Sequence, residues 1–258
     1  MRALTVLGAV VSSMLIAASA QAQDKATAFG SQGQYILSAN RLFSVFAYTN
    51  NKISPDGVQN ADTTYNATSI ALVGGTPSAA LGAGAAGVGA ANGTFYNVPR
   101  FGFDYAIIDK LTIGGEAILF FNLGGSAHLN GSSTSQDLAS GNVWGLAPRV
   151  GYVIGMTDML SIWLRGGLHY YNAQVNTAAA GPGACSPPAS AAHVFGLDLD
   201  PTLVISPGAH VGVMVGPVLD WGFLGGGSVP AGTSCSATNN FSYTSLNFGI
   251  TSGLLGTF

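Results

Sequence analysis

The last part of the chain, residues 241–258, alternates between apolar and polar or small side chains with a period of two residues. One set of alternate positions carries the large apolar side chains Leu246, Phe248, Ile250 and Leu254. Because successive side chains of a β-strand point to opposite faces, this pattern predicts a long strand with one apolar and one polar face. Such a strand suits either the edge of a soluble sandwich or the wall of a barrel, and the rest of the chain decides between them.

Seven further segments alternate in the same way and are predicted to be strands. They are 34–50, 95–107, 111–122, 143–154, 160–172, 194–205 and 209–224. In the first of them Arg41 falls on the same face as Tyr35, Phe43 and Ala47. An arginine in the middle of a lipid-facing surface costs about 2–4 kcal/mol. We therefore expect a β-bulge near Asn40 and Arg41 that turns the Arg41 side chain inward.

The connections between the predicted strands alternate between long and short. Tight turns are expected at 108–110, 155–158 and 206–208, whereas the loops at 51–94, 123–142, 173–193 and 225–240 are long. Barrels of the bacterial outer membrane have short turns at one end and long loops at the other. The fold class predicted is an all-β, antiparallel up-and-down transmembrane barrel of eight strands. A ten-stranded barrel, in which Thr63–Leu72 spans the membrane instead of forming part of an external hairpin, remains the alternative.

The composition favours a membrane location for this barrel. Only 7% of the 258 residues are charged, the mean hydropathy is +0.39, and the apolar residues are not gathered into helical spans. Soluble domains average near 25% charged residues. A closed barrel is the structure other than a helix that satisfies its backbone in lipid. The net charge of −3, with scattered basic residues, gives no indication of a nucleic-acid partner, and we expect none.

The N-terminus has the pattern of a secretory signal. Arg2 precedes an apolar core from Leu4 to Ala17, and small residues follow it. We expect residues 1–22 to be a cleaved signal peptide, 23–33 a periplasmic lead-in and 34–258 the barrel domain. An oxidising compartment would also allow Cys185 and Cys235, both in predicted external loops, to form a disulfide. Two free thiols are the alternative.

Four segments in this order resemble bacterial proteins described as outer-membrane β-barrel proteins of unknown function. They are GQYILSANRLFSVFAY, PRFGFDYAIIDKLTIGGEA, APRVGYVIGMTDMLSIWLRGGLHY and LDLDPTLVISPGAHVGVMVGP. The resemblance as a whole extends over about two thirds of the mature chain and leaves out the loops. The resemblance implies a small eight-stranded barrel in the outer membrane, with outer-membrane lipid and the barrel-assembly machinery as partners. It also implies that the terminal Phe258 belongs to the assembly signal of that class. It implies no activity.

Apart from Arg41, the few charged residues of the predicted strands fall on the inward face. They are Arg100, Asp104, Glu116, Arg149, Arg165, Asp198, Asp200 and Asp220. Strand order puts Glu116 beside Arg149 and Arg165 beside Asp200. The interior of an eight-stranded barrel is just wide enough for side chains to fill it. The favoured interpretation is an ion-paired plug that satisfies buried charges, and the alternative is a narrow, gated path for small solutes.

Catalysis is the third possibility and has little support in the sequence. His169, His210 and the inward aspartates are candidate acid–base groups, yet no nucleophile and base stand at a recognisable spacing. No metal-ligand spacing and no cofactor motif is present either. We therefore expect a protein without catalytic, metal or cofactor site. Its role would be structural or would lie in surface interaction through loops that meet a ligand, and a narrow porin-like channel is the alternative.

Overall fold

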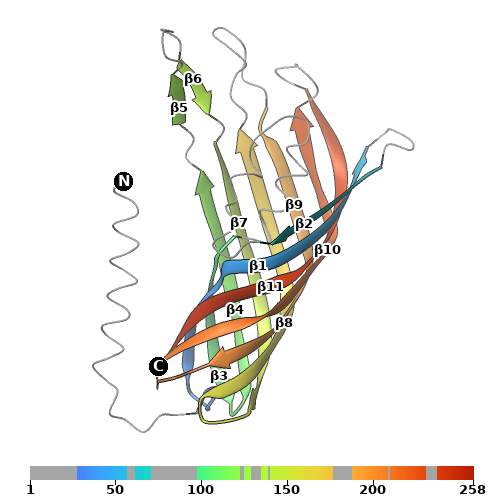
Figure 1. Cartoon of the computed structure of the whole chain (residues 1–258). Coiled ribbons are helices and arrows are strands. Elements are labelled where there is room, and N and C mark those ends of the chain that lie inside the picture. The colour runs from blue at the N-terminus through green and yellow to red at the C-terminus, as the bar shows by residue number, and fades with distance from the viewer. Residues whose placement is uncertain are drawn as a thin grey trace.

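The chain folds as an antiparallel β-barrel (Figure 1). A computed structural model describes residues 28–56, 62–70, 98–122, 125–128, 135–138, 140–176, 188–208, 210–230 and 237–258. Its strands are β1 (Tyr35–Pro55), β2 (Thr63–Ile70), β3 (Arg100–Ile108), β4 (Leu111–Asn122), β5 (Gly125–His128), β6 (Ser135–Leu138), β7 (Ser140–Gly155), β8 (Leu160–Asn176), β9 (Ser190–Ile205), β10 (Val211–Pro230) and β11 (Thr238–Thr257). The predicted signal peptide, 1–22, lies outside the described residues.

Eight of these strands close a ring. Their order is β11-β10-β9-β8-β7-β4-β3-β1, and β1 pairs with β11 to complete the circle. Every neighbouring pair is antiparallel, so the chain runs up and down around the wall. The predicted fold class, an all-β barrel of eight up-and-down strands, is confirmed.

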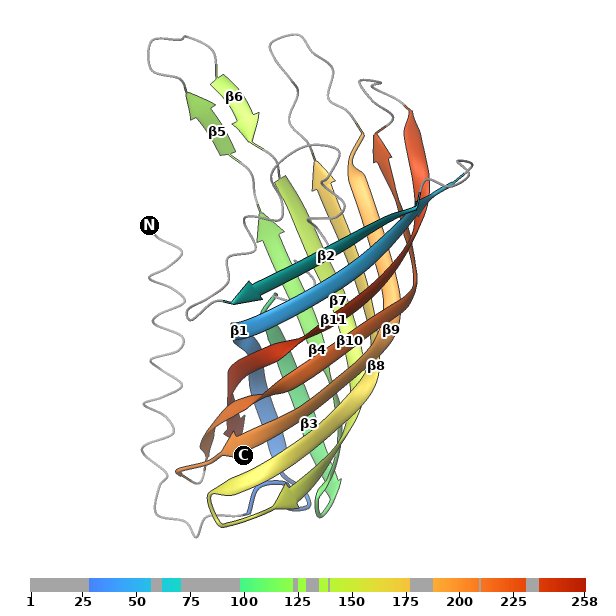
Figure 2. The same cartoon turned by 45° about the vertical axis from the view of Figure 1, so that its right-hand side comes forward.

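The two ends of the barrel differ, as Figure 2 shows. At one end, called the turn end here, short connections at 109–110, 156–159 and 206–210 join the strands, and β1 begins and β11 ends there. The opposite end, called the loop end, carries the longer connections. Part of the predicted loop 123–142 is a hairpin, because β5 pairs with β6. The sequence did not predict this hairpin, since its strands have only four residues each.

The outer surface of the ring is apolar. Along β7 and β11, buried and exposed side chains alternate residue by residue, as the sequence pattern predicted. Large apolar side chains expose between 51% and 62% of their surface to the outside, among them Phe101, Phe121, Leu146, Val150, Leu199, Trp221 and Leu224. An outward apolar band over an inward polar face is the pattern of barrels that span a membrane.

β1 contains the predicted bulge. Its pairing with β11 shifts between Ala39 and Phe43, and Arg41 lies there in the left-handed region with φ of 56°. The bulge turns the Arg41 side chain into the barrel, where only 2% of the residue is exposed, so this prediction is confirmed. A second shift, between Ser44 and Phe46, reverses the alternation. Ala47 therefore points inward and is buried, and its predicted place on the outer face is wrong.

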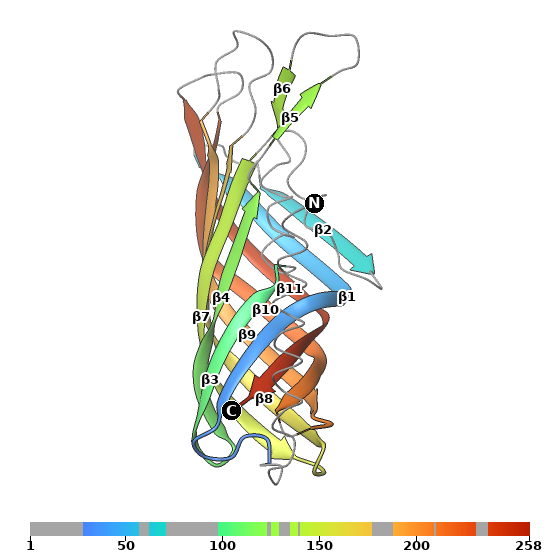
Figure 3. The same ribbon diagram turned by 90° about the vertical axis from the view of Figure 1, so that its left-hand side faces the viewer.

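The bulge is also the place where β1 changes neighbours. On one side of it β1 pairs with β3, as far as Asn40 and Arg100, and on the other side it pairs with β2, from Phe46 to Ile53. Figure 3 shows the β1–β2 pair leading away from β3 toward the loop end. β2 pairs with β1 alone in the described part of the chain and is not a strand of the ring. In the described part of the chain the ring therefore has eight strands, and β1–β2 is a hairpin beside it instead of a spanning pair of a ten-stranded barrel.

The terminal residue lies where the ring closes. The backbone of Phe258 exchanges two hydrogen bonds with Tyr35, at 2.8 and 2.9 Å, and its ring stacks on His210 with the ring centroids 6.4 Å apart. Two thirds of Phe258 is exposed at the rim of the turn end. The assembly role of Phe258 stays a prediction. In the described part of the chain, no helix is long and apolar enough to cross a membrane.

We predict that Cys185 and Cys235 form a disulfide. Both cysteines lie outside the described residues, but the strands at the base of their loops, β9 and β10, are paired up to Ala191 and Ser228. Closing a loop of this length stabilises the fold by about 4 kcal/mol in the chain-entropy model. Intact protein, unfolded in the presence of a thiol reagent without reductant, should gain no label. Two labels per chain in the mass spectrum would contradict the bond.

Candidate functional site: a charged layer inside the barrel

Nine charged side chains meet in the interior of the barrel. They are the predicted residues Arg100, Asp104, Glu116, Arg149, Arg165, Asp198, Asp200 and Asp220, together with Arg41. At most 6% of any of these residues is exposed. We call this set the charged layer. Its four guanidinium groups face five carboxyl groups, so the charges balance to within one unit, which is a condition for burying so many of them.

Four members of the charged layer form a closed ring of ion pairs. Arg41 binds Asp220 at 2.6 Å and Asp198 at 3.0 Å. Arg100 binds the same two carboxylates, at 2.9 Å and 2.7 Å respectively. The members of this ring come from β1, β3, β9 and β10, so the contacts cross the lumen instead of joining neighbouring strands only. The hydroxyl of Tyr171 adds a contact to Nη2 of Arg100 at 2.5 Å.

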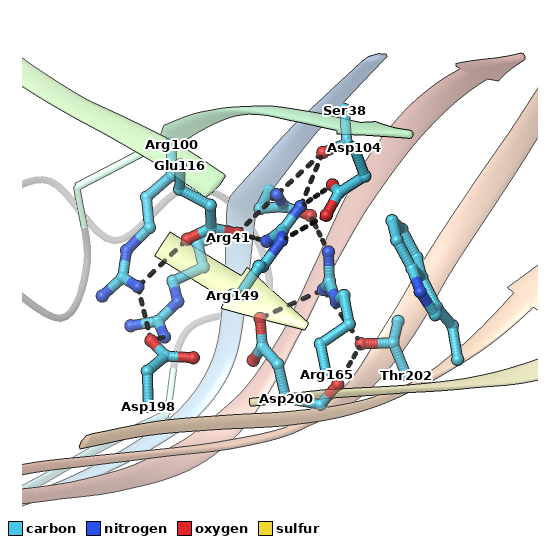
Figure 4. A network of polar contacts seen from close by, with 12 residues as sticks. Ser38, Arg41, Arg100, Asp104, Glu116, Arg149, Arg165, Asp198, Asp200 and Thr202 are labelled. Carbon is cyan, nitrogen blue, oxygen red and sulfur yellow. Dashed lines mark hydrogen bonds and ion pairs between the residues drawn. The ribbon is translucent and has the colours of Figure 1, made fainter. Parts of the chain in front are cut away.

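A second group surrounds Arg149 (Figure 4). The guanidinium of Arg149 donates two hydrogen bonds to Asp104, with Nε 3.0 Å from Oδ1, and it also binds Glu116. Glu116 in turn accepts a contact from Arg100 at 3.1 Å, which joins this group to the ring of four. These contacts link β3, β4 and β7, which are neighbours in the wall.

The third group is centred on Arg165. Its Nη2 lies 3.0 Å from Oδ2 of Asp200 and 3.1 Å from the hydroxyl of Thr202. Its Nη1 donates to the side-chain oxygen of Asn40 at 3.1 Å, and the Asn40 amide donates to Glu116 at 2.6 Å. Asn40 therefore connects the Arg165 group to the Arg149 group, and the whole charged layer is one hydrogen-bonded network. Figure 4 shows a large part of it.

Glycines in the wall make room for these long side chains. A Cβ atom at Gly102 would lie 2.6 Å from Nη2 of Arg149, and one at Gly114 would lie 2.6 Å from Oδ1 of Asp104. One at Gly196 would lie 2.5 Å from Nε2 of His169. Contacts below 3.0 Å require something to shift. Some of the 37 glycines of the chain therefore leave space in the wall for the side chains of the network.

Apolar side chains fill the lumen on both sides of the charged layer. The turn-end cluster contains Ile36, Val153, Trp163, Val204, Met214 and Leu255. The loop-end cluster contains Val98, Ile118, Val143, Tyr171, Ala173, Ala192, Val194, Phe241 and Tyr243. Along β9, for example, the order from the turn end is Val204, then Asp200 and Asp198, then Val194. The lumen is therefore layered, with apolar side chains on both sides of the charged layer.

Sequence reasoning missed two side chains that hold the network together. Asn40 is 3% exposed and bonds to Ser38, Glu116 and Arg165. The indole ring of Trp163 lies under two arginines, with the guanidinium carbons of Arg165 and Arg149 at 4.4 Å and 5.5 Å from its centroid. The signal for Asn40 was the strand alternation, because Asn40 shares the inward face of β1 with Ile36 and Ser38, whereas Arg41 needed the bulge to turn inward.

One group of donors has the spacing of a metal site. Ligand atoms of His169, Asp198 and Asp220 lie within 4.8 Å of one another, and all three residues are buried. However, both carboxylates are already bound by Arg41 and Arg100, so a cation would meet two positive charges at that position. The donor set therefore does not fit a metal ion, although Nδ1 of His169 has no hydrogen-bond partner among the described residues.

The known proteins that are similar to this chain come from the solved structures. No protein-family model and no curated protein sequence matches the chain. Among solved structures, the outer membrane protein OprG from Pseudomonas aeruginosa is 14% identical with a TM-score of 0.46, and the match covers 88% of this chain and 97% of OprG. The outer membrane protease OmpT from Escherichia coli is 8% identical with a TM-score of 0.41, over 91% of this chain and 99% of OmpT. Neisserial surface protein A is 12% identical with a TM-score of 0.38, over 88% and 98%.

Proposed function

We propose that this chain is an integral protein of the bacterial outer membrane with a structural or surface-interaction role. Its lumen is closed by ion-paired side chains, and it carries out no catalysis. The strands form the wall in contact with outer-membrane lipid, and the long loops are the part available to a surface ligand. Insertion through the barrel-assembly machinery, with Phe258 as part of the signal, belongs to the same proposal.

The observation that carries this proposal is the burial of the charged layer. None of its nine members is more than 6% exposed, so no water-accessible space of any size runs beside them. A conducting pore needs a continuous column of water along its polar lining. Here the polar side chains contact one another, and apolar clusters lie between them and each end of the barrel. The lumen is therefore better suited to holding the wall together than to passing solutes.

The apolar outer surface supports the membrane location. Large side chains such as Leu146, Leu199 and Trp221 expose about half of their surface or more on the outside of the ring. Soluble proteins rarely expose contiguous apolar patches of more than a few hundred Å². Contact with lipid explains this surface, and the alternating burial along each strand explains how the same sequence supplies the polar interior.

The same burial argues against catalysis by the inward acids and His169. Asp198 and Asp220 are bound to two arginines each, and His169 is 1% exposed and stacked on Tyr171 with the ring centroids 4.5 Å apart. A general acid or base must reach the substrate within hydrogen-bond distance. In the described part of the chain these groups have no room for a substrate beside them.

The experiment that tests the proposal is recording from planar lipid bilayers that contain the refolded, intact protein. We expect no ion conductance above that of the bare bilayer, because the charged layer excludes a water column. Barrel formation is checked in parallel by a difference in gel migration between unheated and boiled samples. Discrete conductance steps from correctly folded protein would favour the alternative, a narrow porin-like channel.

A further inference from the structure

The segment 28–34 folds against the turn end of the barrel. We call it the strap. It hydrogen-bonds to the β3–β4 turn: Lys110 N donates to Gly30 O at 2.7 Å, and Gln32 N donates to Asp109 Oδ1 at 2.8 Å. Closer to β1, Gly33 N donates to Ala106 O at 2.9 Å. The segment expected from sequence to be a mere lead-in therefore has a defined docked conformation.

Two residues of the strap fit the barrel closely. Phe29 packs against the turn-end cluster, and its ring meets the Trp163 ring edge-on with the centroids 5.3 Å apart. Gly30 is buried, with φ of 83°, and a Cβ atom there would lie 2.8 Å from Cγ2 of Val153. The strap can lie this close because glycine has no side chain and adopts the left-handed region at no steric cost.

Trp163 connects the strap to the charged layer. Its indole ring meets the Phe29 ring edge-on and also lies under the guanidinium groups of Arg165 and Arg149, at 4.4 Å and 5.5 Å from its centroid. Its Nε1 donates to the hydroxyl of Thr112 at 3.1 Å. Phe29, Trp163 and the two arginines therefore form a continuous series of contacts from the turn end of the barrel to the charged layer.

We infer that the strap is a detachable stopper that controls the access of water to the charged layer from the turn end. When it is docked, Phe29 covers Trp163 and the turn-end cluster is complete. When it leaves, Trp163 becomes the outermost ring at that end, and water reaches the base of the Arg165 and Arg149 groups. The loop-end cluster does not change in this step, so undocking opens the lumen from one side only.

Trp163 can report on the docking of the strap. The protein has three tryptophans, and the other two, Trp144 and Trp221, lie on the lipid-facing surface. In a background with Trp144→Phe and Trp221→Phe, all tryptophan fluorescence comes from Trp163. Acrylamide, a small neutral quencher, should quench it weakly while the strap is docked. Phe29→Ala should raise the quenching constant several-fold, and Gly30→Asn should do the same by pushing the strap away from Val153.

Matched controls separate undocking from general damage. Phe101→Ala also removes a phenyl ring, but from the lipid-facing side, where the residue is 61% exposed. Gly33→Asn also puts asparagine at a left-handed position, with φ of 85°, but a Cβ atom there meets nothing within 4 Å. Asparagine tolerates that conformation. Neither control should change the quenching constant.

Two results would overturn the inference. One is ready quenching of Trp163 in the chain that carries only the two tryptophan replacements, and this result does not depend on whether the strap variants fold. The other is an unchanged quenching constant in folded Phe29→Ala and Gly30→Asn. Neither result changes what the bilayer recordings of intact protein would show. The quenching experiment can therefore contradict the role of the strap without contradicting the proposed structural role, and the reverse also holds.

Discussion

Replacing Arg100 by methionine should lower the free energy of unfolding by about 3–5 kcal/mol, the usual cost of removing one partner from a buried ion pair. Arg100 is 0% exposed and contacts Glu116, Asp198 and Asp220 from three other strands. Without it, Asp198 and Asp220 would share the single guanidinium of Arg41 while remaining buried. The measurement is urea unfolding of protein refolded in detergent micelles or lipid vesicles.

Lys52→Met is the matched control for this substitution. Lys52 also forms an ion pair, with its Nζ 2.6 Å from Oδ2 of Asp62, but the two side chains are 50% and 52% exposed. Exposed pairs contribute about 0–1 kcal/mol. The Lys52 variant should therefore unfold close to wild type. If both substitutions had equally small effects, the charged layer would not stabilise the barrel and the plug would be wrong.

A double-mutant comparison should show a second large effect. Arg165→Met and Arg149→Met should each cost about 3–5 kcal/mol. Adding Asp200→Leu to Arg165→Met should recover much of the loss, because Asp200 is the carboxylate that binds Arg165. Adding Glu116→Leu to Arg149→Met should recover less, because Asp104 then stays buried without its arginine.

The two cycles are compared by urea unfolding under identical conditions. Contacting residues give coupling energies of about 0.5–3 kcal/mol, whereas separate residues give additive losses. Strictly additive losses for Arg165 and Asp200 would mean that these side chains do not touch. Equal recovery in both cycles would contradict the assignment of Asp104 to Arg149.

Most of the barrel wall could be predicted from the sequence because it depends on local signals. The alternation along 143–154 and 241–258 predicts which side chains point outward and which point inward, and the short polar turns predict where the strands end. The same alternation put eight of the nine charged residues on the inward face, and the free-energy cost of a charge in lipid predicted that Arg41 turns inward. These inferences need only the period of a strand and the cost of a charge in lipid.

The contacts across the lumen could not be predicted in the same way. Arg41 reaches Asp220 and Asp198, which lie two and three strands away around the ring, and which residues meet there depends on the tilt and stagger of the closed barrel. The strand alternation reverses before Ala47 because β1 has a second bulge. No charged residue would have faced lipid without that bulge, so nothing in the sequence indicated it. The apolar side chains of the loop-end cluster, such as Val143 and Tyr243, gave no signal, because an inward apolar residue is as compatible with strand alternation as an outward one.

The bulge at Arg41 also bears on how slowly the barrel comes apart. β1 and β11 are the first and last strands of the ring, so their pairing joins residues that are far apart in sequence. Arg41 lies on β1 and holds Asp198 and Asp220, which are 157 and 179 residues away. Opening this seam would separate charges inside a hydrocarbon environment in the same step that breaks the β1–β11 hydrogen bonds. Pairing between β1 and β11 is slow to form because the two strands are far apart in sequence. The ion pairs of Arg41 make the same pairing slow to open, so the rate of unfolding sets the lifetime of the folded barrel.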